Sequence, residues 1–355
     1  MASAPTLEYP HEAPKPGGVR TIAEGVIWLR LPLPFELDHI NIYLLRDDGG
    51  WTVVDTGLGD PHTNKLLSAA LEGSLGGEPV IRVICTHMHP DHVGQAGWLC
   101  RRYDAPLWMS RLEYLSARML IADEPPAPQE AIDFLAAAGW ENDWIEKYKE
   151  RYGTFGKGVR PMPQSYTRIE DRDDIAIGDR VWRVITGSGH SPEHVCLWQP
   201  ELKLFISGDQ VLPKISSNVS VWPTEPAADP LEDWLLSCWR LMAAIPDDVL
   251  VLPSHNTPFR GLHARLESLI EGHRRRLERV LEALDEPRRV VDLLPKLFGR
   301  KLSGQDYVMA TGETLAHLNH LVRKGRARYA LDEARVAWFS RDDDAETDPD
   351  DDTLT

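Results

Sequence analysis

Residues 80–93 read VIRVICTHMHPDHV. The first part, Val80–Thr86, is apolar and β-branched apart from Arg82, which is typical of a buried strand rather than a helix. Pro90 is expected to keep the residues after this strand from continuing as regular structure. Imidazole and carboxylate groups are ligands for zinc, iron or manganese, so the segment predicts a metal-binding loop. The alternative is a polar surface loop that happens to contain histidines. The candidate ligands are His87, His89, Asp91 and His92.

Four further segments place a histidine or an aspartate where an apolar run ends. They read VDTG (54–57), TGSGHSPEH (186–194), FISGD (205–209) and LPSH (252–255). In this order, the five segments resemble the motifs of the metallo-β-lactamase superfamily of hydrolases, over roughly residues 20–262. The resemblance implies a four-layer αββα sandwich. The helix and strand patterns by themselves predict only a mixed α/β fold with a large sheet content.

The resemblance also implies a set of seven metal ligands. Seven protein ligands are too many for one tetrahedral ion, whereas two divalent ions can share a carboxylate. Zinc is the expected metal, with iron or manganese as alternatives. The first site is expected to use His87, His89 and His190, the second Asp91, His92 and His255, and Asp209 is expected to bridge the two.

In such a centre a hydroxide between the metals is the expected nucleophile, because metal binding lowers the pKa of water to about 7. Asp91 is expected to take part in catalysis by accepting the proton of the attacking water. Asp55 and His194 are expected to orient the ligands by hydrogen bonds rather than to bind metal. His39 either faces the site or has a structural hydrogen-bonding role, and the structural role is favoured.

An aspartate at position 209 resembles the glyoxalase-II-like, lactonase-like and nuclease-like branches of the superfamily. The expected function is therefore metal-dependent hydrolysis of a small acyl substrate, namely a carboxylic ester, thioester or lactone. A metal-dependent nuclease or phosphodiesterase is the alternative. A binding module without chemistry is disfavoured, because none of the seven ligand positions is lost.

The composition of the chain limits its expected binding partners and location. The formal net charge of −16 disfavours nucleic acid, whose phosphates need a positive surface. The four cysteines are scattered without a C-x-x-C pair, which favours a reducing, cytoplasmic location. The first residues lack the apolar core of a signal peptide, and no apolar run approaches the ~18 residues of a membrane span.

The domain organisation expected from the sequence has four parts. A flexible N-terminus (1–18) precedes a catalytic domain (19–262) with a helical insertion at about 109–166. Residues 263–340 resemble the winged-helix appendage of one superfamily branch, and 341–355 form an acidic tail expected to be disordered. Residues 265–340 carry a net charge of only +4, so we expect this appendage to cover the active-site mouth or to build a homodimer rather than to bind DNA or RNA.

Within the insertion, four aromatic residues recur at every fourth position: Trp140, Trp144, Tyr148 and Tyr152. This spacing predicts one aromatic face of a helix. The favoured interpretation is packing, onto the core or in a dimer contact. The alternative is a lid whose Trp144 and Tyr148 contact the substrate. Lys214, in the segment after Asp209, is a further candidate for contact with a substrate carboxylate.

Overall fold

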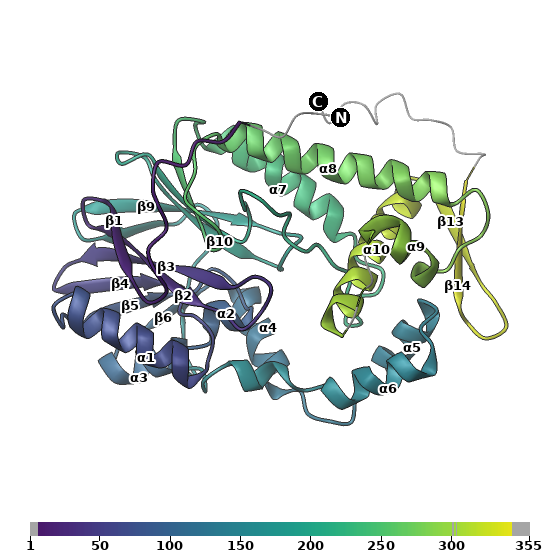
Figure 1. Ribbon diagram of the computed structural model, residues 1–355, viewed down its shortest axis with the longest axis horizontal. Helices are drawn as coiled ribbons and strands as arrows, with labels where there is room; N and C mark the ends of the chain where they lie inside the picture. The colour runs from purple at the N-terminus through teal and green to yellow at the C-terminus, as the bar shows by residue number, and fades with distance from the viewer. Residues whose placement is uncertain (1–5, 300–301, 303, 343–355) are drawn as a thin grey trace. The chain divides into compact units, whose positions relative to one another are not determined.

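The structure is a computed structural model that describes residues 6–299, 302 and 304–342 (Figure 1). It divides into two compact units, neither of which is continuous in sequence. The first comprises the described residues up to 126 together with 151–217 and 233–270. The second comprises 127–150, 218–232 and the described residues from 271 onward. The expected domain boundary at residue 262 therefore differs from the division found in the structure.

The first unit contains a seven-stranded sheet in which the strands follow one another in chain order. β1 to β4 are antiparallel, and β4 to β7 are parallel. The parallel part begins at β5, the strand predicted within residues 80–93, which pairs with β4. The strands are β1 (Val19–Ala23), β2 (Val26–Pro32), β3 (His39–Asp47), β4 (Gly50–Val54), β5 (Val80–Ile84), β6 (Leu107–Met109) and β7 (Thr167–Arg168).

A second, five-stranded sheet has the order β12-β11-β10-β9-β8. All its neighbouring strands are antiparallel except β11 and β12, which are parallel because α7 (Pro230–Ala244) connects them. These strands are β8 (Asp174–Ile177), β9 (Arg180–Gly187), β10 (His194–Gln199), β11 (Leu204–Gly208) and β12 (Leu250–Pro253).

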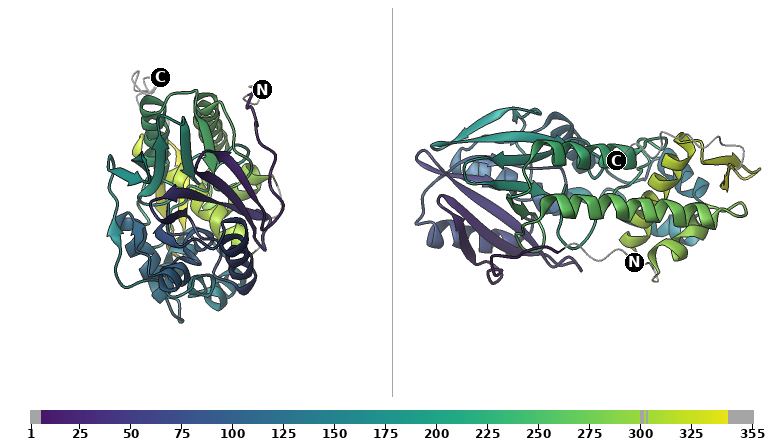
Figure 2. Two further views of the ribbon diagram at one scale, coloured as in Figure 1. Left: turned by 90° about the vertical axis from the view of Figure 1, so that its left-hand side faces the viewer. Right: turned by 90° about the horizontal axis from the view of Figure 1, so that it is seen from above.

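Four layers result. Fully buried side chains such as Trp28, Tyr43 and Trp182 form one core between the two sheets. A second core lies between the first sheet and the helices α1 (Pro61–Ala69) and α3 (Ala96–Tyr103). Figure 2 shows α7 and the start of α8 (Leu262–Ala283) on the outer face of the second sheet. The α/β sandwich expected from the sequence is confirmed.

Pro90 has a different local role from the one expected. It begins a short helix, α2 (Pro90–Val93), because proline lacks only an N–H that the first turn of a helix leaves unbonded anyway. The next helix, α3, begins at Ala96. Gly94 lies between them, where a Cβ would come within 2.4 Å of the carbonyl oxygen of Gly57. Close packing of α2 on the loop after β4 therefore requires glycine here.

The second unit joins part of the expected insertion, residues 127–150, to the C-terminal helices. Trp144 of α6 stacks on Tyr307 of α10 with ring centroids 4.4 Å apart, and Trp140 Nε1 donates to Thr311 Oγ1 at 3.1 Å. Of the four aromatic residues expected on one helix face, α6 contains Trp144 and Tyr148, whereas Trp140 precedes the helix and Tyr152 follows it. The elements are α5 (Gln129–Ala137), α6 (Asn142–Arg151), α9 (Val290–Phe298), α10 (Gln305–Arg323) and the antiparallel hairpin of β13 (Ala327–Leu331) and β14 (Ala337–Arg341).

The ends of the chain were expected to be flexible. Within the described part, residues from Glu8 onward are held by backbone hydrogen bonds, including a bridge between Glu8 and Arg260 and a bond from Gly17 N to Arg30 O. The expected flexibility of residues 1–18 stays a prediction. From residue 343 onward, the acidic tail lies outside the part of the chain that the structure describes. Among the helices that are described, none is long and apolar enough to cross a membrane.

Candidate metal centre

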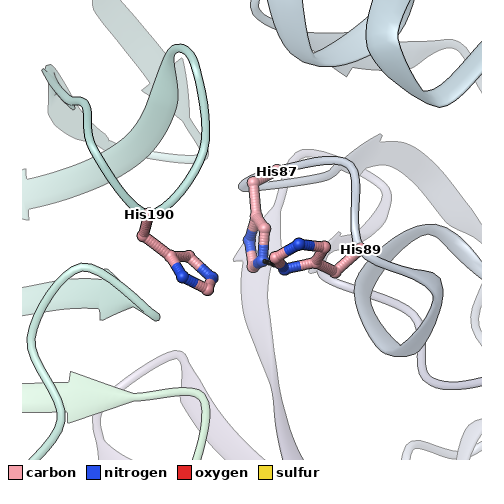
Figure 3. Close-up of side chains that lie close together, drawn as sticks. All are labelled: His87, His89 and His190. Carbon is pink, nitrogen blue, oxygen red and sulfur yellow. Dashed lines mark hydrogen bonds between the residues drawn. The ribbon is translucent and has the colours of Figure 1, made fainter. Parts of the chain in front are cut away.

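The loop after β5 and the loop after β9 bring three histidines together. His87 Nε2 lies 2.8 Å from His89 Nδ1, and the His190 ring approaches these two from the opposite side (Figure 3). One nitrogen of each ring lies within 4.8 Å of the others. His190 comes from a loop about 100 residues away in sequence, so the second sheet completes the group that the first sheet begins.

Asp91, His92 and His255 form a second group of the same kind. Asp91 and His92 lie on α2, and His255 follows β12 of the other sheet. The Oδ2 atom of Asp91 is 3.5 Å from His255 Nε2 and 3.7 Å from His92 Nε2. These side chains therefore converge with ring nitrogens and a carboxylate oxygen facing one another.

Asp209, at the end of β11, stands between the two groups. Its Oδ2 is 3.6 Å from His190 Nε2 and 3.7 Å from His92 Nε2, and its Oδ1 is 3.3 Å from His255 Nε2. Zinc bonds of about 2.0–2.2 Å in a tetrahedron place ligand atoms roughly 3.3–3.6 Å apart. The distances from Asp91 and Asp209 to the histidine nitrogens are close to this spacing, whereas His87 and His89 lie closer together, at 2.8 Å. The seven side chains named from the sequence thus lie together in the structure, and their role as ligands stays a prediction.

Asp55 orients His92. Its Oδ2 accepts a hydrogen bond from His92 Nδ1 at 2.8 Å, which assigns the proton to that nitrogen and turns the Nε2 lone pair toward the centre. The other oxygen, Oδ1, accepts from Thr86 N, and the Thr86 hydroxyl bonds the same carboxylate. Thr86 Oγ1 also lies 3.0 Å from His87 Nδ1. The arrangement is the one expected of Asp55 from the sequence.

A backbone carbonyl does the same for His255. Its Nδ1 donates to the carbonyl oxygen of His39 at 2.7 Å, leaving Nε2 for the centre. The ring of His39 points elsewhere, and its Nε2 accepts from Asn256 N at 2.7 Å. His39 therefore has the structural hydrogen-bonding role that the sequence favoured.

His194 holds the backbone of Asp209. Its buried Nε2 accepts from Asp209 N at 3.0 Å, so this nitrogen is used by the backbone. Gly208 has a φ of +53°, and a Cβ there would lie 2.3 Å from the His194 ring. Glycine is therefore required for this contact. The bond from Asp209 N uses the His194 nitrogen that would otherwise face Asp209, and orientation of a ligand rather than metal binding stays the prediction for His194.

Burial and neighbouring charges shift the pKa values of the histidines in opposite directions. Burial lowers the pKa of His87 and of His89 well below the usual value, and the neighbouring imidazoles lower it further. Burial likewise lowers the pKa of His194 to about 3. Burial opposes ionisation of Asp209, but His255 and His92 outweigh it and hold the pKa of that carboxyl well below its usual range. The pKa values of His92 and His255 are instead raised, because neighbouring carboxylates, Asp55 for His92 and Asp209 for His255, outweigh burial. These two rings would therefore lose a proton on binding a metal, whereas His87 and His89 are already neutral.

The donor set fits divalent metal ions. Among the described residues, His92 Nε2 and Asp209 Oδ1 are buried without a hydrogen-bond partner, which is costly for polar atoms unless another group satisfies them. A cation bound between the facing nitrogens and oxygens would do so.

The structure does not bring every predicted site residue to this centre. Lys214 is exposed on the loop after β11, and Trp144 and Tyr148 belong to the second unit. Their contact with substrate stays a prediction. Thr86 was missed as a hydrogen-bonding residue, although its position between the buried strand and His87 was a usable signal.

The fold and the centre define a metal-dependent hydrolase, and comparison with known families agrees. The chain belongs to the metallo-beta-lactamase superfamily, whose model matches residues 36–255. Residues 277–342 match a second model, described as the metallo-beta-lactamase-like C-terminal domain. The motif-based prediction of the family is confirmed.

The protein is similar to a solved beta-lactamase domain protein from Burkholderia ambifaria, with a TM-score of 0.88 and 39% identity over 94% of this chain and 98% of that one. It is 26% identical to the probable metallo-hydrolase YqjP of Bacillus subtilis, covering 84% of this chain and 92% of that protein.

Two relatives are named as thioesterases. The chain is 25% identical to the atrochrysone carboxyl ACP thioesterase of Aspergillus fumigatus, covering 86% of this chain and 62% of that protein. It is 27% identical to the acyl-coenzyme A thioesterase MBLAC2 of Gallus gallus, covering 68% of this chain and 80% of that protein.

Proposed function

We propose that the protein is a dinuclear, zinc-dependent thioesterase that hydrolyses an acyl thioester of the coenzyme A or acyl-carrier type. The convergence of two ligand groups on Asp209 carries the dinuclear part of the proposal. The names of the two thioesterase relatives support the substrate class. Carboxylic esters and lactones have the same reacting carbonyl and make up the wider range of substrates.

The residues of the centre would have separate roles. Divalent ions, when bound, supply a Lewis acid for the carbonyl oxygen and a water of lowered pKa. Asp91 is the more accessible carboxylate of the centre, with 19% of its side chain exposed against 10% for Asp209. It is therefore the better placed to accept the proton of the attacking water. The ions would be held by His87, His89 and His190 on one side and by Asp91, His92 and His255 on the other, with Asp209 between them.

An exposed apolar face of a helix bonded to the His190 loop is a candidate contact for an acyl chain. Helix α4 (Arg111–Ala122) exposes Leu112, Leu115 and Met119, which lie on one face of the helix. The first turn of α4 is bonded to the His190 loop, since Leu112 N donates to Glu193 Oε2 at 2.9 Å.

A substrate panel tests the proposal. The purified chain, loaded with zinc or manganese, would be assayed with acyl-coenzyme A thioesters, p-nitrophenyl esters, acyl lactones and bis(p-nitrophenyl) phosphate. We expect close to two metal ions per chain by elemental analysis and the highest kcat/KM on a thioester. His87→Ala should lose metal and activity, whereas the exposed His62→Ala should retain both.

A different result would contradict each part of the proposal. Faster turnover of the phosphodiester than of any thioester would favour a nuclease or phosphodiesterase. Silence on the whole panel with both metals bound would favour a binding protein. A His87→Ala protein with full metal content and full rate would contradict the ligand assignment.

A further inference from the structure

A buried carboxylate outside the seven ligands joins the two loops that carry the first histidine group. Glu113, on α4, has no solvent-exposed surface. Its Oε2 accepts from Met88 N, which lies between His87 and His89, at 2.9 Å. Its Oε1 accepts from two donors of the other loop, Ser191 Oγ at 2.6 Å and Glu193 N at 2.8 Å. One side chain therefore spans the loops of both sheets.

The contact is reciprocal. The first turn of α4 has N–H groups without partners inside the helix, and Leu112 N donates to Glu193 Oε2. The Ser110 hydroxyl donates to the carbonyl oxygen of Glu193 at 2.7 Å. The start of α4 and the loop after His190 thus hold each other by hydrogen bonds in both directions, which leaves Glu113 little freedom to move away.

All three partners of Glu113 are donors, so the position requires a group that only accepts. An ionised carboxylate does this with both oxygens, whereas the amide of glutamine would aim N–H at one of the donors. Burial raises the pKa of Glu113 to about 7, while the bonds from Ser191, Glu193 and Met88 act in the opposite sense. A carboxylate buried with no cation among these three bonds needs a reason beyond packing.

We propose that Glu113 is a positioning residue that sets the separation of the His87/His89 loop from the His190 loop, and so the metal affinity of this half of the centre. The proposal rests on the metal role assigned to these histidines above. Glu113 bonds the residues next to the ligands and none of the ligands themselves. Its loss should therefore weaken the first group while leaving Asp91, His92 and His255 in place.

The experiment is a zinc titration of the full-length chain, stripped of metal and reloaded in the presence of a chromophoric chelator. Glu113→Gln is expected to remain folded, to keep one tightly bound ion and to bind the other roughly 10- to 100-fold more weakly. The cobalt(II)-substituted variant should show a changed visible spectrum for one of its two ions. A purely structural role would not produce either selective change.

Asp47→Asn is the matched control. Asp47 is also buried and also accepts three hydrogen bonds, from Asp48 N, Thr52 Oγ1 and Gly178 N. It lies at the β3–β4 hairpin, roughly 17 Å from the Asp55 end of β4 at about 3.3 Å per residue. This variant should lose thermal stability but keep both metal affinities and the cobalt spectrum.

Ser191→Ala is a second variant that tests the proposal even if Glu113→Gln fails to fold. It removes one hydrogen-bond donor to Glu113 and leaves the carboxylate in place. It should weaken the same ion by a smaller factor. Wild-type affinities and spectra in Glu113→Gln and in Ser191→Ala would overturn the inference. Absence of metal binding in the wild-type chain would instead refute the proposed function, so the two failures are distinguishable.

Discussion

At the scale of single residues, the centre depends on which nitrogen of each histidine carries the proton. His92 donates Nδ1–H to Asp55 and His255 donates Nδ1–H to the carbonyl of His39, so both present Nε2 to the centre. Such partners fix the tautomer and orient the ring, and their loss commonly costs 10- to 100-fold in metal affinity or activity. The acceptors are therefore part of the site even though they bind no metal.

Asp55→Asn tests this directly. An amide nitrogen facing His92 Nδ1 would favour the other tautomer, which places a proton on the nitrogen needed for metal. We expect kcat/KM and the affinity for one ion to fall by about 10- to 100-fold. Metal titration and steady-state assays measure the change, with Asp47→Asn as the control for a buried carboxylate elsewhere. Full metal affinity in Asp55→Asn would show that the tautomer is held by other contacts.

At the scale of elements, ligands gather because the strands of two packed sheets end next to one another. β4 and β5 of the first sheet lead to Asp55 and to the His87 loop, while β11 and β12 of the second lead to Asp209 and His255. Parallel neighbours such as β4 and β5, or β11 and β12, have their carboxyl ends at the same edge. The chain must turn sharply at this edge, and Gly208, the last residue of β11, has the left-handed backbone that such a turn requires.

Gly208→Ala should be disruptive for two separable reasons. A left-handed backbone costs an L-residue about 1–2 kcal/mol, and the added Cβ would also overlap the His194 ring. Gly49 has a φ of +81° and open space around it. Gly49→Ala should therefore lose only the stability that the left-handed backbone costs. We expect Gly208→Ala to lose at least about 1–3 kcal/mol more stability than Gly49→Ala and to lose metal as well. Equal unfolding midpoints for the two variants would contradict this account.

The aromatic face of α6 gives a prediction for the second unit. Trp144→Ala removes the stack on Tyr307 and should destabilise the protein by roughly 2–3 kcal/mol, less than a fully buried tryptophan because Trp144 is partly exposed. A double-mutant cycle with Tyr307→Ala should give a coupling of about 0.5–1.5 kcal/mol in thermal or denaturant unfolding. A change in substrate preference with unchanged stability would instead favour the lid interpretation.

At the scale of the whole molecule, the candidate metal centre joins parts of the chain that packing and hydrogen bonds, such as those of Glu113, also connect. Its ligands come from both sheets of the first unit, so bound ions would link the sheets in the folded state. A ligand that binds only the folded protein stabilises it by RT ln(1 + [L]/Kd), about 4 kcal/mol at 1,000 times Kd.

Metal removal should therefore lower the thermal unfolding midpoint by several degrees and abolish hydrolysis, and readdition of zinc should restore both. Differential scanning calorimetry with and without a chelator measures the effect. The same chelator should leave the midpoint of a His87→Ala, His255→Ala double variant unchanged, since that protein has lost a ligand from each group. An equal shift in the double variant would mean that the stabilising ion binds elsewhere.

The sequence by itself determined the candidate ligand set and most of the elements, because apolar strands can be read locally and the five motifs resemble those of the metallo-β-lactamase superfamily in their order. The role of these residues as metal ligands stays a prediction. The tertiary structure decided what depends on distant packing. It placed residues 127–150 with the C-terminal helices, used the backbone oxygen of His39 to orient His255, and brought Glu113 against both histidine loops. A hydrogen bond between residues far apart in the chain leaves no periodic signal, since it is defined only once the sheets and helices have packed.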